Sequence, residues 1–234
     1  MGCGMMRSPE KILIFLLSAL AVLSLWVCGI ALADVYDDFS RSGIDTDKWT
    51  LSGTPGLFTQ SEGRLRFFGK KNAAQTLEST ITFEPGFFRI EFYDFYSSND
   101  ALPGRGIGSY LALGLGPRVN YVRVLRGRVR SGGYFEANHF TDNNLQLWHL
   151  PTAVGFGQLG LYYDGSTVSL FYNIGLDANK GWQMVGPRIT PGWDSSPKLF
   201  ISGYPGADGR TRFAVDNVEY VPAPLPSTLL KRLK

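Results

Sequence analysis

The chain has 234 residues, of which 44% are hydrophobic, 14% are aromatic and 2 are cysteine, and its formal net charge is +3. An unfolded chain does not carry this much aromatic surface, so we expect a folded protein. Charges of both signs are interspersed, which argues against a nucleic-acid partner. Two histidines without an HExxH motif, and cysteines only at Cys3 and Cys28, argue against a catalytic zinc centre or a disulfide framework.

The beginning of the chain resembles an export signal. An uncharged run, residues 12–33, follows Arg7 and Lys11 and ends in an Ala-Leu-Ala triplet at Ala33. These are the parts of a secretory signal peptide, so we expect cleavage near Ala33 and a protein that is secreted or lies on the extracellular side of the cell envelope. The run is also long enough to span a bilayer as an uncleaved anchor, which would be the protein's one contact with a membrane. A lipoprotein anchored through Cys28 is a further alternative.

Removal of the signal peptide, residues 1–33, leaves 201 residues with 21 Lys+Arg and 19 Asp+Glu, because the leader contains Arg7, Lys11 and Glu10. Both cysteines are removed with it. The remaining chain has no Asn-x-Ser/Thr sequon, which agrees with a bacterial source. The exported part is therefore close to neutral and free of thiols.

From residue 34 to 221 apolar residues alternate with polar ones in short runs separated by Gly, Pro, Asn or Asp. This alternation predicts strands, and no stretch sustains the 3.6-residue period of an amphipathic helix. Asp164-Gly165, between two such runs, has the composition of a tight hairpin turn. We therefore predict a single all-β domain, an antiparallel sandwich or barrel. The predicted strands are 64–68, 77–83, 87–96, 109–115, 120–125, 128–134, 158–163, 167–173, 181–185, 198–203 and 211–220.

Four short motifs in this domain resemble those of bacterial concanavalin A-like lectin/glucanase domains. They are D-D-F…I-D…W in Asp37–Trp49, G-x-L in Glu62–Arg66, D-G…W in Asp164–Trp182 and F-x-x-D-N-V in Phe213–Val218. The resemblance implies an antiparallel β-sandwich of the jelly-roll type, with the first and last strands close together. It also implies a polysaccharide or cell-surface glycan as the partner.

The motif of the catalytic members is absent. Laminarinase-like members carry E-x-D-x-x-E on one strand, because retaining hydrolysis needs two carboxyl groups about 5–5.5 Å apart. Here Glu91 and Asp94, and likewise Asp216 and Glu219, are three residues apart and fall on opposite faces of a strand. We therefore expect a non-catalytic glycan-binding or envelope/matrix protein, although the sequence leaves open whether it is an enzyme.

Three other functions remain open. Segments 89–93 and 134–139 resemble parts of alginate lyase strands, so a jelly-roll polysaccharide lyase is one alternative. The Q-I-H element of that family is missing, and Glu136 stands where the family has Lys. A hydrolase with an atypical site and a structural surface protein without a small ligand are the others.

Candidate ligand-binding residues follow from the strand alternation, which places polar and aromatic side chains opposite an apolar face. If their strands are neighbours in one sheet, as the resemblance implies, this face offers aromatic rings for sugar C–H surfaces and guanidinium groups for carboxylates. The alternative is the solvated side of an antiparallel sheet. The candidates are Arg89, Glu91, Tyr93, Tyr110, Tyr121, Arg123 and Arg130.

A structural Ca²⁺ near the terminal strands is also implied by the resemblance, with Asp38 and Asp216 at the corresponding positions. Carboxylate oxygens are the ligands that Ca²⁺ prefers. The alternative is that Asp38 caps a turn and Asp216 pairs with an arginine.

The C-terminal tail, residues 222–234, is Pro-rich and then basic. It resembles a PEP-CTERM-type sorting signal, but only two leucines stand where a membrane span needs about 20 apolar residues. A truncated sorting signal and a disordered basic end are both consistent with this tail.

Overall fold

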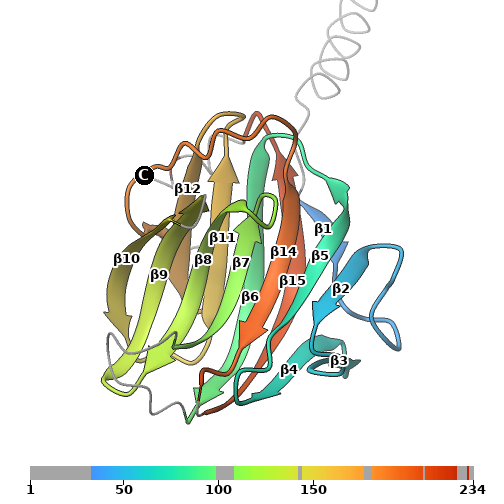
Figure 1. The fold of residues 1–234 in the computed structure, drawn as a ribbon. Coiled ribbons are helices and arrows are strands. Elements are labelled where there is room, and N and C mark those ends of the chain that lie inside the picture. Colours follow the sequence, from blue (N-terminus) through green and yellow to red (C-terminus); the bar gives the residue numbers. More distant parts are fainter. Residues whose placement is uncertain are drawn as a thin grey trace, which may run out of the picture. The chain divides into compact units, whose positions relative to one another are not determined.

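A computed structural model of the chain describes residues 33–98, 108–141, 144–176, 181–207, 209–225 and 231 (Figure 1). The predicted signal peptide, apart from Ala33, and most of the predicted tail lie outside these residues. Among the residues described, no helix is both long and apolar enough to cross a membrane.

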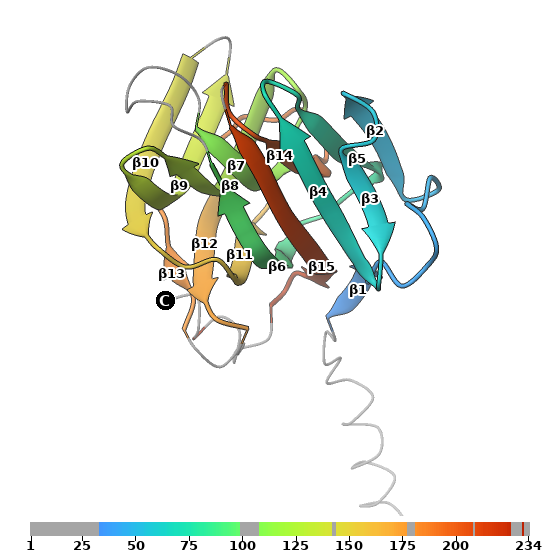
Figure 2. The ribbon, with the colours of Figure 1, turned by 90° about the horizontal axis from the view of Figure 1, so that it is seen from below.

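The described strands form two antiparallel sheets. Sheet A has the order β13-β12-β11-β6-β15-β4-β3, and β1 also pairs with β15. Its strands are β1 (Asp34–Asp37), β3 (Phe58–Ser61), β4 (Arg64–Lys70), β6 (Gly86–Ser97), β11 (Gly157–Tyr163), β12 (Val168–Ile174), β13 (Gln183–Met184) and β15 (Arg210–Pro222). Figure 2 shows β1 beside the end of β15.

Sheet B has the order β10-β9-β8-β7-β14-β5-β2 and faces the viewer in Figure 1. Its strands are β2 (Trp49–Gly53), β5 (Gln75–Thr82), β7 (Ser109–Leu115), β8 (Asn120–Val129), β9 (Gly132–Thr141), β10 (Asn144–Thr152) and β14 (Lys198–Tyr204). The predicted antiparallel β-sandwich is confirmed, and the first and last strands pair as expected.

The core lies between the two sheets. It is formed by every second side chain of each strand, because successive side chains point to opposite faces of a sheet. Ile90 and Phe92 of β6 face Leu113 of β7 and Val122 and Val124 of β8 across the sandwich, and all are 0% exposed. Each such side chain contributes about 1.5–3 kcal/mol when it is fully buried. The opposite side chains of each strand point to the outer face of its sheet. The alternation in the sequence therefore decides which residues can line an outer site.

The strand prediction is incomplete and in one place wrong: it omits β1, β2, β3 and β10, and the predicted strand 128–134 is not a single strand. The predicted strand 128–134 runs through a turn, because Val129 pairs with Gly132 and only Arg130 and Ser131 lie between them. Arg-Ser is not a turn pair of the Asn-Gly type, but Gly132-Gly133 directly after it is a turn signal, and the predicted strand runs through it. Strand β10 was not predicted at all; its leucines are exposed at the edge of the sheet, and Pro151 interrupts the pattern.

Candidate functional site

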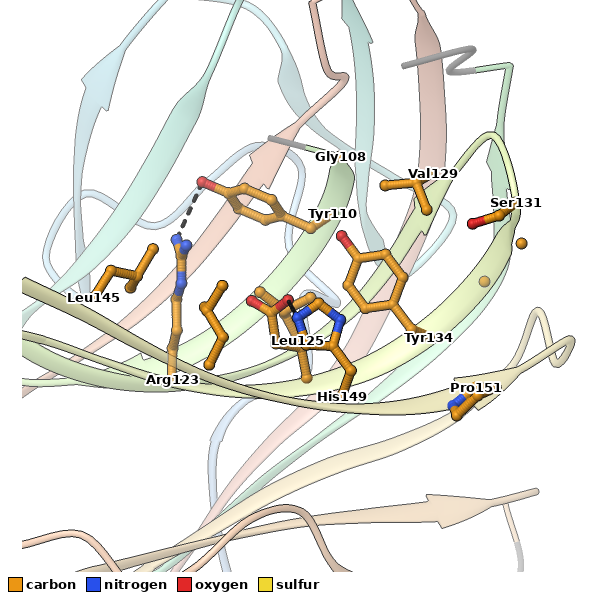
Figure 3. Close-up of a pocket in the computed structure, with 14 residues that line it drawn as sticks. Gly108, Tyr110, Arg123, Leu125, Val129, Ser131, Tyr134, Leu145, His149 and Pro151 are labelled. Carbon is orange, nitrogen blue, oxygen red and sulfur yellow. Dashed lines mark hydrogen bonds and ion pairs between the residues drawn. The ribbon is translucent and has the colours of Figure 1, made fainter. Parts of the chain in front are cut away.

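The outer face of sheet B is hollowed by three neighbouring cavities. The first has a volume of about 580 Å³ and is lined by β7, β8, β9 and β10 (Figure 3). The second, of about 210 Å³, shares Tyr110 and Arg123 with the first. The third, of about 640 Å³, shares Glu78, Gly116 and Arg118 with the second. We call the three together the sheet B groove; it crosses the strands.

Strand register places the polar residues of the first cavity in rows across the sheet. Arg123 of β8 lies opposite Asn138 of β9, and Glu136 of β9 lies opposite His149 of β10. The neighbouring core residues, such as Ala137, point to the other side. Each row therefore brings side chains from different strands within hydrogen-bonding distance on the groove side.

These rows join into one hydrogen-bonded network. Arg123 Nε donates to Asn138 Oδ1 at 2.8 Å, and its Nη1 donates to the Tyr110 hydroxyl at 3.1 Å. Asn138 Nδ2 donates to Glu136 Oε1 at 2.8 Å, and Glu136 Oε2 lies 3.0 Å from His149 Nε2. Arg123, Glu136 and Asn138 are buried, whereas the His149 side chain is half exposed. The network thus leads from the floor of the sheet to solvent at β10.

Tyr134 forms one wall of the first cavity, and its ring needs a glycine beneath it. A Cβ at Gly127, directly opposite in the register, would lie 2.5 Å from the Tyr134 ring. Burial, and then the charge of Glu136, raises the pKa of Tyr134 above its ordinary value. The hydroxyl therefore stays protonated at neutral pH and can donate a hydrogen bond to a ligand.

Aromatic rings surround the boundary between the first and second cavities. Tyr121 stacks on Phe140 with ring centroids 5.1 Å apart and meets Phe200 edge-on at 5.7 Å. The guanidinium carbon of Arg123 lies 4.6 Å from the Tyr110 centroid and 5.2 Å from that of Tyr121. Burial raises the pKa of Tyr121. Rings in this arrangement offer apolar faces beside a fixed positive charge.

The candidate residues do not share one face, so that expectation is wrong. Tyr110, Tyr121 and Arg123 line the sheet B groove. Arg130 is exposed in the turn between β8 and β9 and lines none of these three cavities.

Arg89, Glu91 and Tyr93 lie on β6 in sheet A, on the opposite side of the sandwich. They form two sets of contacts that are separate from the groove and from each other. Arg89 donates to the Glu219 carboxylate through Nε at 2.8 Å and through Nη2 at 2.7 Å. Glu91 accepts hydrogen bonds from the Tyr93 hydroxyl at 2.7 Å and from Asn217 Nδ2 at 3.1 Å. These polar groups satisfy one another, which explains their presence on an outer face without a ligand.

Several residues that line the groove or support it were not among the candidates, notably Tyr134, Glu136, Asn138, His149 and Arg118. The signal was present in the segment Tyr134–Asn138, where polar residues alternate with Phe135 and Ala137. It was missed because the start of β9 was assigned to the preceding strand. His149 could not be placed without β10.

Asp38 and Asp216, the candidate calcium ligands, are both engaged within the chain. Asp38 Oδ1 accepts the Ser40 amide at 3.0 Å, and these contacts with Ser40 lower the pKa of Asp38. Asp216 lies 3.6 Å from Arg64 Nε, and burial raises its pKa. Within the described part of the chain, no group of three or more His, Cys, Asp or Glu residues could hold a metal ion. Both carboxylates are thus engaged as the alternative to a calcium site predicts, which leaves Ca²⁺ binding at this pair to be decided by chelation.

No protein-family model matches the sequence, and no curated protein matches it. Among solved structures, a GH43B protein of a Bacteroides ovatus xyloglucan locus superposes with a TM-score of 0.60 at 11% identity, covering 79% of this chain. This chain spans only 38% of that protein. LamAcat of Zobellia galactanivorans superposes with a TM-score of 0.55 at 13% identity, and the match covers 79% of this chain and 95% of LamAcat. A β-glucanase of Bacillus licheniformis superposes with a TM-score of 0.56 at 9% identity, and the match covers 79% of this chain and 96% of the glucanase.

At these identities the likeness shows the fold alone. The fold that this chain shares with all or part of these proteins is the two-sheet antiparallel β-sandwich that the sequence predicts.

Proposed function

We propose that this protein is exported and binds a polysaccharide chain in the sheet B groove, without cleaving it. The observation that carries the proposal is the row of three adjoining cavities across the outer face of one sheet. Seven strands at a spacing of about 4.8 Å give a face about 30 Å wide, enough for several sugar units of a polymer. The export signal predicted at the start of the chain agrees with a partner outside the cell.

The chemistry of the groove suits a sugar chain. Tyr110, Tyr121 and Tyr134 offer ring faces to sugar C–H surfaces. Glu136 and His149 offer polar atoms that can pair with hydroxyl groups beside those rings. An apolar lining with a few directed polar groups is the usual composition of a small-ligand site.

The carboxylates of the first and second cavities, which are lined by the tyrosines of the groove, are not placed for glycoside hydrolysis. Hydrolysis needs two carboxyl groups about 5–9.5 Å apart, depending on the stereochemical course. The first cavity is lined by Glu136 on β9 and the second by Glu78 on β5, four strand spacings or about 19 Å away. Glu78 also pairs with Lys198 at 3.2 Å. Binding without cleavage therefore fits better.

A polysaccharide lyase is the second candidate, and one observation favours it. The imidazole of His149 is held by Glu136 through Nε2, and its ring centroid lies 5.1 Å from that of Tyr134. Elimination from a uronate requires a base, a proton donor and a cation near the carboxylate. His149, Tyr134 and Arg123 are groups of these three types in one cavity (Figure 3).

A panel of soluble polysaccharides distinguishes the two functions. We expect some polymer to raise the melting temperature of the protein without releasing reducing ends or unsaturated products. Tyr110→Ala should abolish the shift, whereas Tyr162→Ala, on the outer face of sheet A, should leave it unchanged. Release of unsaturated products would establish the lyase instead. No shift and no product with any polymer would leave a structural surface protein.

A further inference from the structure

Arg123 is a buried charge on the floor of the sheet B groove. Its side chain comes from β8, near the middle of sheet B, and is only 9% exposed. It lines both the first and the second cavity. Figure 3 shows it rising from the strand toward the Tyr110 hydroxyl, with the first cavity beside it.

The partners of this guanidinium are neutral. Nε donates to the Asn138 amide oxygen and Nη1 to the Tyr110 hydroxyl. Within the described residues Arg123 forms no ion pair with a carboxylate, and no hydrogen bond of its Nη2 is found there. Glu136 is reached only through Asn138 and is itself paired with His149. Glu136 therefore acts on Arg123 only at a distance, and a buried guanidinium with no carboxylate in direct contact has lost hydration that no ion pair replaces.

Two other arginines show how this chain otherwise satisfies a partly or fully buried guanidinium. Arg126, on the core side of β8, donates to the carbonyl oxygens of Val154 and Gly127, and burial lowers its pKa to about 10. Arg89, in sheet A, forms a two-pronged ion pair with Glu219. Neither lines the groove. Arg123 is instead charged, held in place by neutral groups, and open to a cavity.

A second arginine lies further along the groove. Arg118, in the turn between β7 and β8, lines the second and third cavities and likewise forms no ion pair within the described residues. The cation Lys198 in the third cavity is already paired with Glu78. The second cavity is thus lined by two arginines outside any ion pair and by Glu78, which is paired, whereas Asp194 of the third cavity is a carboxylate without an ion pair in the described part of the chain. The unpaired positive charge of the groove is therefore concentrated at the second cavity.

We propose that the ligand of the groove is an acidic polysaccharide, and that Arg123 binds a carboxylate or sulfate of one sugar unit. The proposal rests on the function proposed above, since it names the class of glycan that the same groove takes. A planar guanidinium with an unused edge matches the two oxygens of such a group. The Asn138 and Tyr110 contacts fix its orientation before the ligand arrives, which reduces the entropy lost on binding.

Calorimetric titration of the full chain with pairs of acidic and neutral polymers tests whether the groove binds an acidic polysaccharide. The pairs are polygalacturonate against its methyl ester, and a sulfated galactan against its desulfated form. We expect at least one acidic polymer to bind ten-fold or more tightly than its neutral partner, with an affinity that falls as salt is raised. The pair that shows the preference identifies carboxylate or sulfate as the group bound.

Variants separate this inference from the proposed function. Arg123→Met should remove the preference for the acidic polymer, Arg123→Lys should keep part of it, and Arg130→Gln should behave as wild type. Equal binding of acidic and neutral polymers, unchanged in Arg123→Met, would overturn the acidic ligand but keep a glycan groove. Absence of binding by every polymer would overturn both. If Arg123→Met does not fold, the comparison of each acidic polymer with its neutral partner on the wild-type protein still shows whether the groove prefers an acidic ligand.

Discussion

Gly114→Ala is expected to weaken both the fold and the groove. Gly114 of β7 lies opposite Phe200 of β14 on the outer face of sheet B. A Cβ at this position would lie 2.1 Å from Cζ of Phe200 and 2.6 Å from its Cε2. Carbon atoms in contact are normally separated by about 3.5 Å, so the ring has to move by about 1.4 Å. The ring lines the second cavity, so we expect it to move toward that space.

Such overpacking typically costs about 1–3 kcal/mol of folding free energy. For a domain of this size a loss of about 2 kcal/mol corresponds to a fall in melting temperature of roughly 4–8 °C. Polysaccharide binding should weaken too, because the displaced ring loses its edge-on contact with Tyr121 and fills part of the groove.

Thermal denaturation with and without polymer measures both effects. Gly181→Ala is the matched control: nothing lies within 4 Å of the added Cβ, so its stability should stay within about 0.5 kcal/mol of wild type. A Gly114→Ala protein that melts within 1 °C of wild type and binds equally well would refute the close approach of Phe200.

Three further predictions concern titratable side chains outside the groove network. Desolvation pushes the pKa of Asp164 upward, but hydrogen bonds from Thr167 and Ser166 together lower it to about 2. The ionised carboxylate therefore stabilises the folded protein fully above about pH 3.8, and this stabilisation is lost as the pH falls through 2. In urea unfolding, Asp164→Ala should therefore lower the free energy of unfolding by about 1 kcal/mol at pH 7, after allowance for solvent screening. Near pH 1.5 the same substitution should leave the free energy of unfolding unchanged. Burial lowers the pKa of His139 in β9, so wild-type stability should decline as pH falls below about 6.5, and His139→Gln should show a flatter decline between pH 7 and 5. Removal of Ca²⁺ with a chelator should change the melting temperature by less than about 1 °C, because Asp38 and Asp216 are occupied by contacts within the chain. A larger decrease that is absent in Asp216→Asn would instead show that Asp216 binds calcium.

The sequence predicted the strands and their faces better than it predicted the site. Alternation identifies which residues share a side of one strand, and it correctly places Tyr110, Tyr121 and Arg123 away from the core. It carries no information about which sheet a strand joins. Strands β6 and β7 follow one another in the chain but lie in opposite sheets, so Arg89 and Tyr110 face opposite sides of the molecule.

The polar network of the groove could not be assembled from the sequence for the same reason. Glu136 and His149 are 13 positions apart, and they meet only because β9 and β10 pair in the register that sets them opposite each other. The buried position of Arg123 depends on Tyr110 and Asn138 from two other strands. Such contacts follow from strand pairing, which the period of two does not determine.

Mapping a bound polysaccharide by nuclear magnetic resonance tests the central claim most directly. Amide shifts on titration with a polymer that raises the melting temperature should concentrate at Tyr110, Arg123 and Glu136, in the strands that line the sheet B groove. Shifts concentrated instead at Arg89 and Tyr93, on the outer face of sheet A, would contradict the account.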